Sequence, residues 1–595
     1  MSGTSISKRF RMALNRDEGM KQLDKVVEDY GFVKGQPFTF EDHEYQIEIM
    51  RDTQSRIDVR KCSQVGLSEL MVQKCLALSA VLRHNTIMFS LPTRDMAQKF
   101  SKHRFDGAIV SSEHYSSMMS AGENSSAMKK LGSSYIYVIG TYGDNSAIST
   151  PAEMIMSDEV DFSNPIVLGK LNSRIRHAKN VDEKGKRGFR YRFSTPTVEG
   201  FGIDKGFQNG DQRYYMCRCE HCEKWVCPDY LQDFIIPGWD KGMLEFNLDN
   251  LRDPRYNTEA AYIQCSNCKK DLFKSLLDPA RRQWVALHPD RWDHSYQVNP
   301  WDVPTYNTPQ EIVRQYEDYP LKADFFNFVL GLPFSDADNT FVTTDKHRAF
   351  TCTIDLWIYQ NCVVPMGTVG GMDIGKTLHL VVKVKAGPGW HVIWMEKIHN
   401  TQEDPATARV LDRFDFYGMR KLCIDAGPDI TLVNLLVSAR EGIQAVVYTS
   451  VSGFHAIEEK KAGDVINADR TKTLTLLMQD HNSGKYRYPH SDSCKIELFQ
   501  HYATTKKLRE PGADGVVKEK FIKTDKQDHW VHALNYANIA GMAVELNLGS
   551  DTGAAMPQVG TVKLGSKPTD APKEEPGHVL QGMFGFKKPG GVRFR

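Results

Sequence analysis

Two stretches of the sequence combine the side chains that phosphate chemistry needs, and the first is "RKCSQVGLSE" (60–69). There, Gly66 offers a turn, Ser68 a hydroxyl for Mg²⁺, and Lys61 a cation for phosphate oxygens. The common phosphate-loop pattern has a glycine where Lys61 stands and its lysine where Leu67 stands. A long lysine side chain can reach the same phosphates from the start of the loop. Taken alone, the stretch is more typical of an ordinary strand–turn–helix.

The second stretch is "AEMIMSDEV" (152–160), an apolar strand that ends in Asp158 and Glu159. In phosphoryl transfer one carboxylate holds Mg²⁺ and another orients or deprotonates the attacking water. We assign these roles to Asp158 and Glu159 in that order. The alternative is a solvated strand end, but the two stretches support each other as parts of one ATP site on one sheet.

Three weaker features lie near these stretches. "FSTPT" (193–197) places hydroxyl groups at a strand end, where they can sense the γ-phosphate, and in "HEYQ" (43–46) Tyr45 can stack on adenine while Gln46 hydrogen-bonds its edge. Each is also compatible with a plain turn. From the basic run 170–192, Arg174 or Arg176 can reach DNA phosphate or a neighbour's nucleotide, although such runs are usually solvated faces.

A cysteine cluster predicts a metal site. Two C-x-x-C pairs supply four thiolates, the closed ligand set of structural zinc. Cys217 and Cys227 are spare candidates, and the long gap between the pairs predicts an inserted loop. The four expected Zn²⁺ ligands are Cys219, Cys222, Cys265 and Cys268.

Three carboxylates predict a second catalytic centre. Asp373 lies on a strand in "GGMDIG", Asp425 ends the strand in "RKLCIDAG", and Asp528 begins the last long helix, "DHWVHALNYA". Converging in this order, they can hold two Mg²⁺ or Mn²⁺ ions that activate water and stabilise the leaving oxygen of a phosphodiester. His529 and His532 flank the third carboxylate. Each aspartate alone is more typical of a turn, a strand end or a helix cap.

The chain of 595 residues is long enough for several domains. Its formal net charge is +1, so any contact with DNA must come from local basic patches. Strand-like runs alternate with helical stretches and predict parallel sheets flanked by helices. No run is long and apolar enough for a membrane span, and no export signal is seen, so we expect a reducing cytoplasm. The expected parts are an N-terminal segment (1–45), an ATPase (46–205), a zinc-ribbon-like insert (206–285), a helical connector (286–355), a nuclease (356–548) and a mobile tail (549–595).

In order along the chain, these motifs resemble those of tailed-phage terminase large subunits of the lambda-type group. The resemblance runs from about residue 40 to about residue 545 and rests on the whole series. The series is "KCSQVGLS" (61–68), "SLPT" (90–93), "SDE" (157–159), "STPT" (194–197), the paired knuckles, "LGLPF" (330–334), "GGMDIG" (370–375) and "DHWVHALNYA" (528–537).

The resemblance implies an α/β multidomain protein with a P-loop (ASCE-type) ATPase, a zinc-ribbon-like insert and an RNase H-like nuclease. It implies ATP-driven translocation of double-stranded DNA into a procapsid, and cutting of concatemeric DNA. The implied partners are a small terminase subunit, the portal protein and, in a ring, further copies of the chain, in the host cytoplasm. A fourth nuclease carboxylate is not evident, with Glu396 and Asp429 as candidates.

Three alternatives remain open at this point. A helicase or translocase with a nuclease module would have both the ATP site and the three-carboxylate centre. A second motor lobe with helicase motifs, which a helicase would also need, is not evident. A zinc-bearing DNA-binding or assembly protein would have an inert phosphate loop. An integrase-like recombinase would use the three aspartates and leave the first half of the chain without a role.

Overall fold

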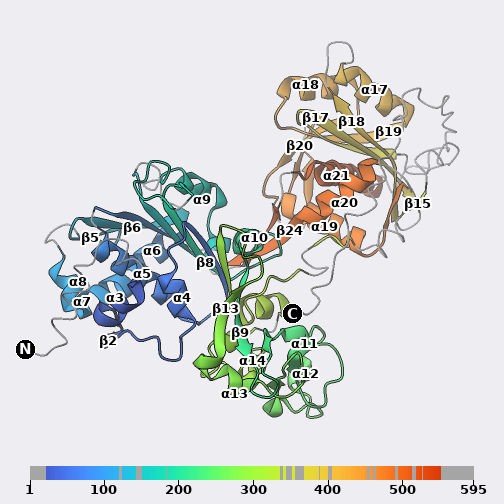
Figure 1. Cartoon of the computed structure of the whole chain (residues 1–595). Helices are drawn as coiled ribbons and strands as arrows, with labels where there is room; N and C mark the ends of the chain where they lie inside the picture. The colour runs from blue at the N-terminus through green and yellow to red at the C-terminus, as the bar shows by residue number, and fades with distance from the viewer. Residues whose placement is uncertain are drawn as a thin grey trace, which may run out of the picture. The chain divides into compact units, whose positions relative to one another are not determined.

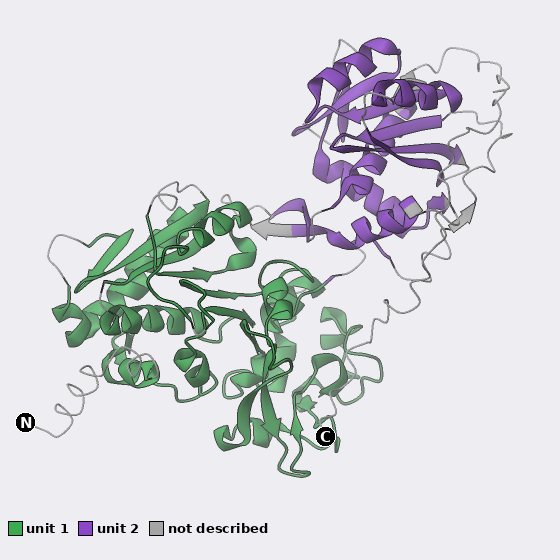
Figure 2. Cartoon of the chain, turned by 45° about the horizontal axis from the view of Figure 1, so that its top comes forward, with its two compact units in different colours: residues 1–334, 591–595 green, residues 335–590 purple. Residues whose placement is uncertain are grey.

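The computed structural model describes residues 22–82, 84–119, 124–142, 150–182, 184–319, 321–335, 340–343, 352–354, 368–386, 389–399, 405–451, 456–459, 464–489, 493–511, 517–524 and 527–550. The chain divides into two compact units, Met1–Phe334 with Gly591–Arg595, and Ser335–Gly590 (Figure 2). Expectations for residues 1–21 and 551–595 lie outside the described residues.

The first unit is built on one sheet with helices packed against it (Figure 1). Its strand order is β10-β9-β14-β3-β8-β7-β4-β6-β5, with β13 also paired to β9. The run from β9 to β6 is parallel throughout, and β5, β10 and β13 join it antiparallel. The expected parallel sheet is confirmed. The strands are β3 (Arg56–Lys61), β4 (Thr86–Thr93), β5 (Met128–Leu131), β6 (Ser134–Tyr142), β7 (Met154–Asp158), β8 (Phe189–Ser194), β9 (Arg213–Arg218), β10 (Trp225–Val226), β13 (Arg282–Ala286) and β14 (His294–Val298).

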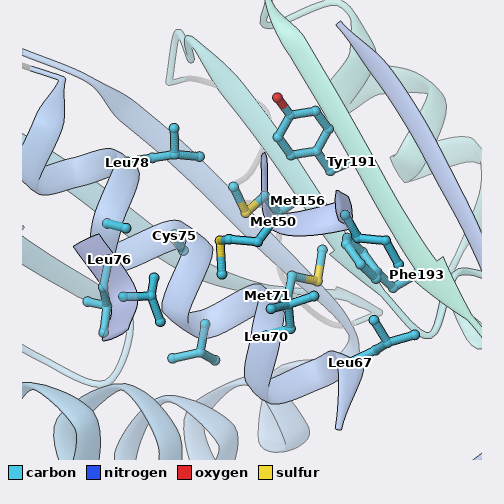
Figure 3. Packing of buried hydrophobic residues seen from close by; sticks show 14 of the residues in the cluster. Met50, Leu67, Leu70, Met71, Cys75, Leu76, Leu78, Met156, Tyr191 and Phe193 are labelled. Carbon is cyan, nitrogen blue, oxygen red and sulfur yellow. The ribbon is translucent and has the colours of Figure 1, made fainter. Parts of the chain in front are cut away.

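Helix α5 (Leu67–Val81) follows the candidate phosphate loop and is buried on nearly every side. Figure 3 shows Met71 of this helix in the same buried cluster as Met156 of β7 and Phe193 of β8. A helix that is apolar all round must be covered all round, and here the sheet and helices α3 and α4 cover it. Burying each large aliphatic side chain contributes about 1.5–3 kcal/mol, so the loop is anchored by a stable helix.

Other helices of this unit flank the sheet or connect its strands. They are α3 (Leu23–Tyr30), α4 (Gln46–Arg51), α6 (Arg94–Phe100), α7 (Asp106–Ser111), α8 (Glu113–Ser117), α9 (Pro165–Asn172) and α10 (Gly202–Asn209), with a small hairpin of β1 (Phe32–Val33) and β2 (Gln36–Pro37).

The expected domain boundaries differ from the structure at three places. Helix α3 packs its Leu23, Val26 and Val27 into the same core as α5, so residues after 22 belong to the first unit and not to a separate N-terminal segment. Strand β14, inside the expected helical connector, pairs in parallel with β3. Strands β9 and β13, inside the expected insert, also join this sheet. A five-residue strand between distant partners leaves little local signal, which is why the pattern missed it.

The cysteine region and the connector share a core of their own. That core includes Cys219, Phe246, Trp301, Tyr316 and Phe325. The elements are α11 (Tyr230–Asp233), β11 (Phe234–Ile235), α12 (Leu248–Leu251), β12 (Tyr262–Ile263), α13 (Phe273–Leu276), α14 (Pro309–Arg314), α15 (Lys322–Asp324) and a π-helical turn (Phe325–Val329).

The second unit has a nine-stranded sheet in the order β15-β23-β18-β17-β16-β19-β20-β22-β21. Strand β17 runs antiparallel to its two neighbours, β16 and β18, whereas β19 and β20 follow β16 in parallel. This arrangement agrees with the RNase H-like fold expected from the sequence. The strands are β15 (Cys352–Ile354), β16 (Thr368–Asp373), β17 (Thr377–Ala386), β18 (Gly389–His399), β19 (Met419–Asp425), β20 (Ile443–Tyr448), β21 (Ile457–Glu459), β22 (Val465–Ala468) and β23 (Tyr486–Pro489), with a separate hairpin of β24 (Thr505–Pro511) and β25 (Val517–Lys523).

The long helix α21 (His529–Ser550) packs across β16, β17 and β19. Its approach to β16 is close because the strand offers glycine. A Cβ at Gly371 would lie 1.9 Å from the backbone nitrogen of Ala537 and 2.2 Å from the carbonyl oxygen of Ala533. Glycine in "GGMDIG" therefore lets the helix that carries His529 lie directly on the strand that carries Asp373. The remaining helices are α17 (Ala406–Phe416), α18 (Ile430–Ala439), α19 (Arg470–Asn482) and α20 (Ser493–Thr504).

Candidate functional site

The candidate phosphate loop connects β3 to the beginning of α5. Gly66 precedes the helix with φ 75°, a left-handed conformation that favours glycine, and an added Cβ would lie 2.9 Å from Nε2 of Gln46. The first backbone N–H groups of α5 have no partner within the helix, and the helix dipole favours an anion there. This end of the helix can therefore bind phosphate.

Four side chains from three elements meet beside this loop. Lys61 ends β3, Ser68 lies in the first turn of α5, Asp158 ends β7, and Glu159 directly follows that strand. The Lys61 Nζ lies 3.0 Å from Oε1 of Glu159. The Ser68 hydroxyl lies beside the Asp158 carboxylate and lowers its pKa. The structure thus brings together the residues that the sequence assigned to phosphate, Mg²⁺ and water.

The charges in this cluster are strongly coupled because the site is buried. Burial and the neighbouring Glu159 raise the pKa of Asp158 to about 6, against the opposing effects of Lys61 and Ser68. Burial alone would lower the pKa of Lys61, but the two carboxylates outweigh it and raise that pKa. A divalent cation beside Asp158 would relieve the repulsion between the two acids.

Glu159 adopts a strained backbone that aims its side chain at the loop. Its φ is 51°, rare for a residue with a Cβ, and its N–H donates to the carbonyl of Phe193 at 2.9 Å. The Thr195 hydroxyl donates to Oε2 of Glu159 at 3.4 Å. Strain of this kind is held where it serves a site. The "STPT" stretch therefore contacts the acid that we expect to act on water.

Sequence reasoning missed Asp161, which ties this acidic turn to the "STPT" stretch. The Thr197 N–H and hydroxyl donate to Oδ2 of Asp161 at 2.9 and 2.8 Å, and the Ile203 N–H donates to Oδ1 at 2.7 Å. Burial raises the pKa of Asp161 to about 7 despite these donors. An acidic residue next to "SDE" carried no separate signal in the sequence.

The "LGLPF" motif also contacts the phosphate loop. The Ser63 N–H donates to the Phe328 carbonyl at 2.7 Å, and the Phe334 N–H donates to the Thr197 carbonyl at 3.1 Å. Gly331 has φ 66°, and a Cβ there would lie 2.4 Å from the backbone nitrogen of Cys62. The motif thus braces both the phosphate loop and the "STPT" stretch from the end of the first unit.

Tyr45 does not present its ring as expected. It is 1% exposed, and its hydroxyl donates to the Val65 carbonyl. Gln46 is also buried, and its Nε2 donates to the same carbonyl at 3.0 Å. An adenine ring has no free face of Tyr45 to stack on in this structure. Both side chains instead fix the phosphate loop by donating hydrogen bonds to its Val65 carbonyl.

Arg174 and Arg176 lie away from the phosphate loop. They follow α9, and the Arg174 carbonyl accepts from the Ala152 N–H at 3.3 Å, just before β7 begins. The loop lies at the other end of the parallel strands. Neither arginine therefore belongs to the nucleotide site of its own unit.

The four knuckle cysteines come together as expected. The distances are 3.8 Å from Cys219 Sγ to Cys268 Sγ and 3.8 Å from Cys222 Sγ to Cys265 Sγ. All four sulfurs lie within 4.8 Å of one another. A tetrahedron with Zn–S bonds of about 2.3 Å has edges of about 3.8 Å, so the set fits zinc.

Both knuckles have the same backbone form. The Cys219 N–H donates to the Lys224 carbonyl at 3.0 Å, and the Cys265 N–H donates to the Lys270 carbonyl at 2.7 Å. The spare candidates do not join them. Cys217 lies on β9 opposite Val226, and burial raises its thiol pKa to about 12. Burial likewise raises the pKa of Cys227, so both thiols stay neutral.

The three predicted aspartates lie at the ends of two strands and just before one helix of the second unit, but among the described residues they do not form one group with ligand atoms within 4.8 Å. Asp373 and Asp425 end the neighbouring parallel strands β16 and β19, and Asp528 directly precedes α21. Burial and the charge of Asp373 raise the pKa of Asp425. Two neighbouring carboxylates whose charges oppose each other form a suitable divalent-cation site.

The local partners of these aspartates differ. Asp528 lies 3.3 Å from Nε2 of His532 and 3.3 Å from Nζ of Lys523. Burial opposes its ionisation, but these two partners outweigh burial and lower its pKa. Asp373 instead accepts from Nδ1 of His529 at 2.8 Å. Among the described residues, Asp373, His379 and His529 offer ligand atoms within 4.8 Å of one another, and sequence reasoning missed His379.

Neither candidate for a fourth carboxylate joins this centre. Glu396 pairs with Arg409 at 2.7 Å and with Arg413 at 2.8 Å. It lies opposite Leu380, one residue beyond the His379 position, so the strand alternation directs it to the other face of the sheet. Asp429 caps α18 by accepting from the Leu432 N–H at 3.0 Å. The structure therefore contradicts Glu396 as a ligand and gives Asp429 a helix-cap role.

Comparison with known proteins gives one family and several distant folds. Residues 36–282 match the family model described as phage terminase large subunit gpA, ATPase domain. No curated protein matches the sequence as a relative. Among the part of the chain that the structure describes, no helix is long and apolar enough to cross a membrane.

The solved structures that resemble this chain share little sequence with it. The large terminase of bacteriophage HK97 is 11% identical with a TM-score of 0.48, over 87% of this chain and 99% of that one. The large terminase ATPase domain of a Thermus phage, solved as a mutant, is 13% identical with a TM-score of 0.30, over 51% and 100%. The large terminase nuclease of the thermophilic phage G20c is 14% identical with a TM-score of 0.21, over 29% and 80%.

Proposed function

We propose that this chain is a phage terminase large subunit and acts as an ATP-driven motor that moves double-stranded viral DNA into a procapsid. We propose further that its second unit cuts concatemeric DNA with a metal-dependent centre. The observation that carries the proposal is the cluster of Lys61, Ser68, Asp158 and Glu159 inside the region that matches the ATPase family model.

In the ATPase, each residue of the cluster has one role. Lys61 exchanges its contact with Glu159 for phosphate oxygens, which frees the carboxylate to accept a proton from the attacking water. Ser68 and Asp158 would hold Mg²⁺, which would neutralise the negative charge that develops on the phosphates. Thr195 keeps the other oxygen of Glu159 in place.

In the nuclease, Asp373, Asp425 and Asp528 are the proposed ligands of divalent cations. Such ions supply an activated water and stabilise the leaving oxygen of the phosphodiester. The raised pKa of Asp425 beside Asp373 supports this assignment, because a cation there would relieve the repulsion. His532 and Lys523 hold the Asp528 carboxylate in its ionised form.

The four-cysteine cluster is the proposed Zn²⁺ site. Four protein ligands leave no open position, so the ion stabilises the fold and does no chemistry. Its thiolates anchor the region that shares a core with the connector.

The finer assignments follow from the family and are part of the same proposal. Gln46 positions the phosphate loop, and Arg174 or Arg176 contacts DNA or a neighbouring copy in a packaging ring. The small terminase subunit and the portal protein are the proposed partners, and the host cytoplasm is the proposed compartment.

DNA-stimulated ATP hydrolysis by the full chain tests the motor. Glu159→Gln should remove hydrolysis with duplex DNA present, because the carboxylate can no longer take a proton. Glu199→Gln is the matched control, since Glu199 is exposed just after the "STPT" stretch. Equal hydrolysis by wild type and Glu159→Gln would refute the assigned role.

A further inference from the structure

We propose that His379 and His529 join Asp373 as ligands of one divalent first-row transition-metal ion in the second unit. The inference rests on the proposed nuclease for its setting and adds to it the kind of metal that the centre selects. It concerns two imidazoles that the three-aspartate assignment leaves without a role.

Three different elements bring these side chains together. Asp373 on β16 pairs directly with His379 on the antiparallel strand β17, so both side chains lie on one face of the sheet. His529 begins α21 and places its Nδ1 2.8 Å from Oδ2 of Asp373. The His379 and His529 rings are stacked, with centroids 5.0 Å apart and planes 12° apart. One ligand atom from each residue lies within 4.8 Å of the other two.

His379 supplies a second, independent observation. It is 6% exposed, and its Nδ1 is buried without a hydrogen-bond partner among the described residues. Buried polar atoms are nearly always bonded, so this nitrogen needs an explanation. Coordination of a metal ion through Nδ1 would supply the partner that the protein does not.

An ordinary ion pair accounts for only part of the arrangement. It explains why His529 faces Asp373, but it leaves His379 buried against the edge of Trp530, with ring centroids 4.7 Å apart. The Trp530 indole N–H is itself fixed by Oε2 of Glu497 at 2.7 Å. This buried support holds the imidazole as a preorganised ligand would be held.

The donor set determines the class of ion. Imidazole nitrogen favours first-row transition metals, whereas Mg²⁺ prefers oxygen ligands and retains water. A site of two imidazoles and one carboxylate should therefore bind Mn²⁺ or a later metal ion more tightly than Mg²⁺. Asp425, next to Asp373 but outside the group of three, leaves an oxygen-only position for a second ion.

The test is pulsed electron paramagnetic resonance of Mn²⁺ added to the full chain, with zinc in the four-cysteine site only, free zinc removed and no nucleotide. We expect ¹⁴N modulation from coordinated imidazole in the wild type. His379→Gln should reduce that modulation and weaken Mn²⁺ binding by about tenfold or more. His391→Gln is the matched control, because its strand position pairs with Val384, five residues along β17 from His379.

The second variant, His529→Gln, decides the question if His379→Gln does not fold, because the His529 side chain is 41% exposed. Bound Mn²⁺ without ¹⁴N modulation, or modulation and affinity that neither variant changes, would overturn the ligand assignment. Plasmid cutting is measured separately. Cutting without imidazole coupling would keep the nuclease and reject the histidine ligands, whereas coupling without cutting would do the reverse.

Discussion

The close contact between α21 and β16 makes a quantitative prediction at Gly371. In Gly371→Ala the new Cβ would lie 1.9 Å from the Ala537 nitrogen, and real Cβ contacts below 3.0 Å are essentially never seen, so the helix must recede by about 1.1 Å. Forcing extra volume into a packed core costs about 1–3 kcal/mol. For a domain of this size each kcal/mol lowers Tm by roughly 2–4 °C. We therefore expect a loss of about 2–12 °C in the second unit.

The same shift should reduce cutting, because α21 begins at His529 and directly follows Asp528. A displacement of about 1 Å in a catalytic constellation can cost about 100-fold in rate. Calorimetry of the full chain measures stability, and an added ATP analogue identifies the transition of the first unit by shifting it. Gly375→Ala is the control, since its Cβ would meet nothing closer than 3.5 Å. Equal stability and cutting in both variants would refute the packing argument.

Further predictions concern the first unit. Lys61→Ala should weaken binding of a fluorescent ATP analogue tenfold or more, which corresponds to about 1.4 kcal/mol. Glu159→Gln should leave this binding intact. Equal binding by the two variants would contradict these roles. Burial lowers the pKa of Lys74 to about 8 from 10.5, so the unfolded chain binds more protons between these values and stability rises with pH across that window. The difference in free energy of unfolding between wild type and Lys74→Met, measured in urea, should increase in favour of the wild type by about 3 kcal/mol from pH 7 to pH 10.5. The same difference at both pH values would show that Lys74 stays charged in the folded chain. Cys222→Ser should release zinc, measured by atomic absorption, and expose the cysteine region to protease, whereas Cys227→Ala should retain the metal.

Much of the fold followed from local patterns, because the elements that carry chemistry are strongly marked. The apolar runs that became β4, β7 and β16 are each bounded by turn residues, and each strand lies where the pattern predicted. The carboxylates Asp158 of β7 and Asp373 of β16 could be placed because each ends a strand, and the ends of parallel strands meet at one edge of a sheet. The strand β14 could not, since its only mark is a short alternation and its partner β3 lies far away in sequence.

The sequence predicted those site residues that belong to a recognisable motif. It did not predict those that reach the site only through tertiary packing. Asp161 acts through contacts with residues that follow β8, and His379 through a strand pair and a helix, and neither has a spacing rule that marks it. Tyr45 shows the opposite failure, because an aromatic residue before a phosphate loop fits base stacking in sequence but is buried in the core. Glu396 failed for the same reason, since its two arginine partners come from α17.

Separation of the two activities in the full chain is the most direct test of the two-centre account. Duplex-stimulated ATP hydrolysis and Mn²⁺-dependent plasmid cutting would be measured side by side for wild type, Glu159→Gln and Asp373→Asn. The account predicts that Glu159→Gln cuts without hydrolysing ATP, and that Asp373→Asn hydrolyses ATP without cutting. Loss of both activities in either folded variant, or retention of cutting by Asp373→Asn, would contradict it.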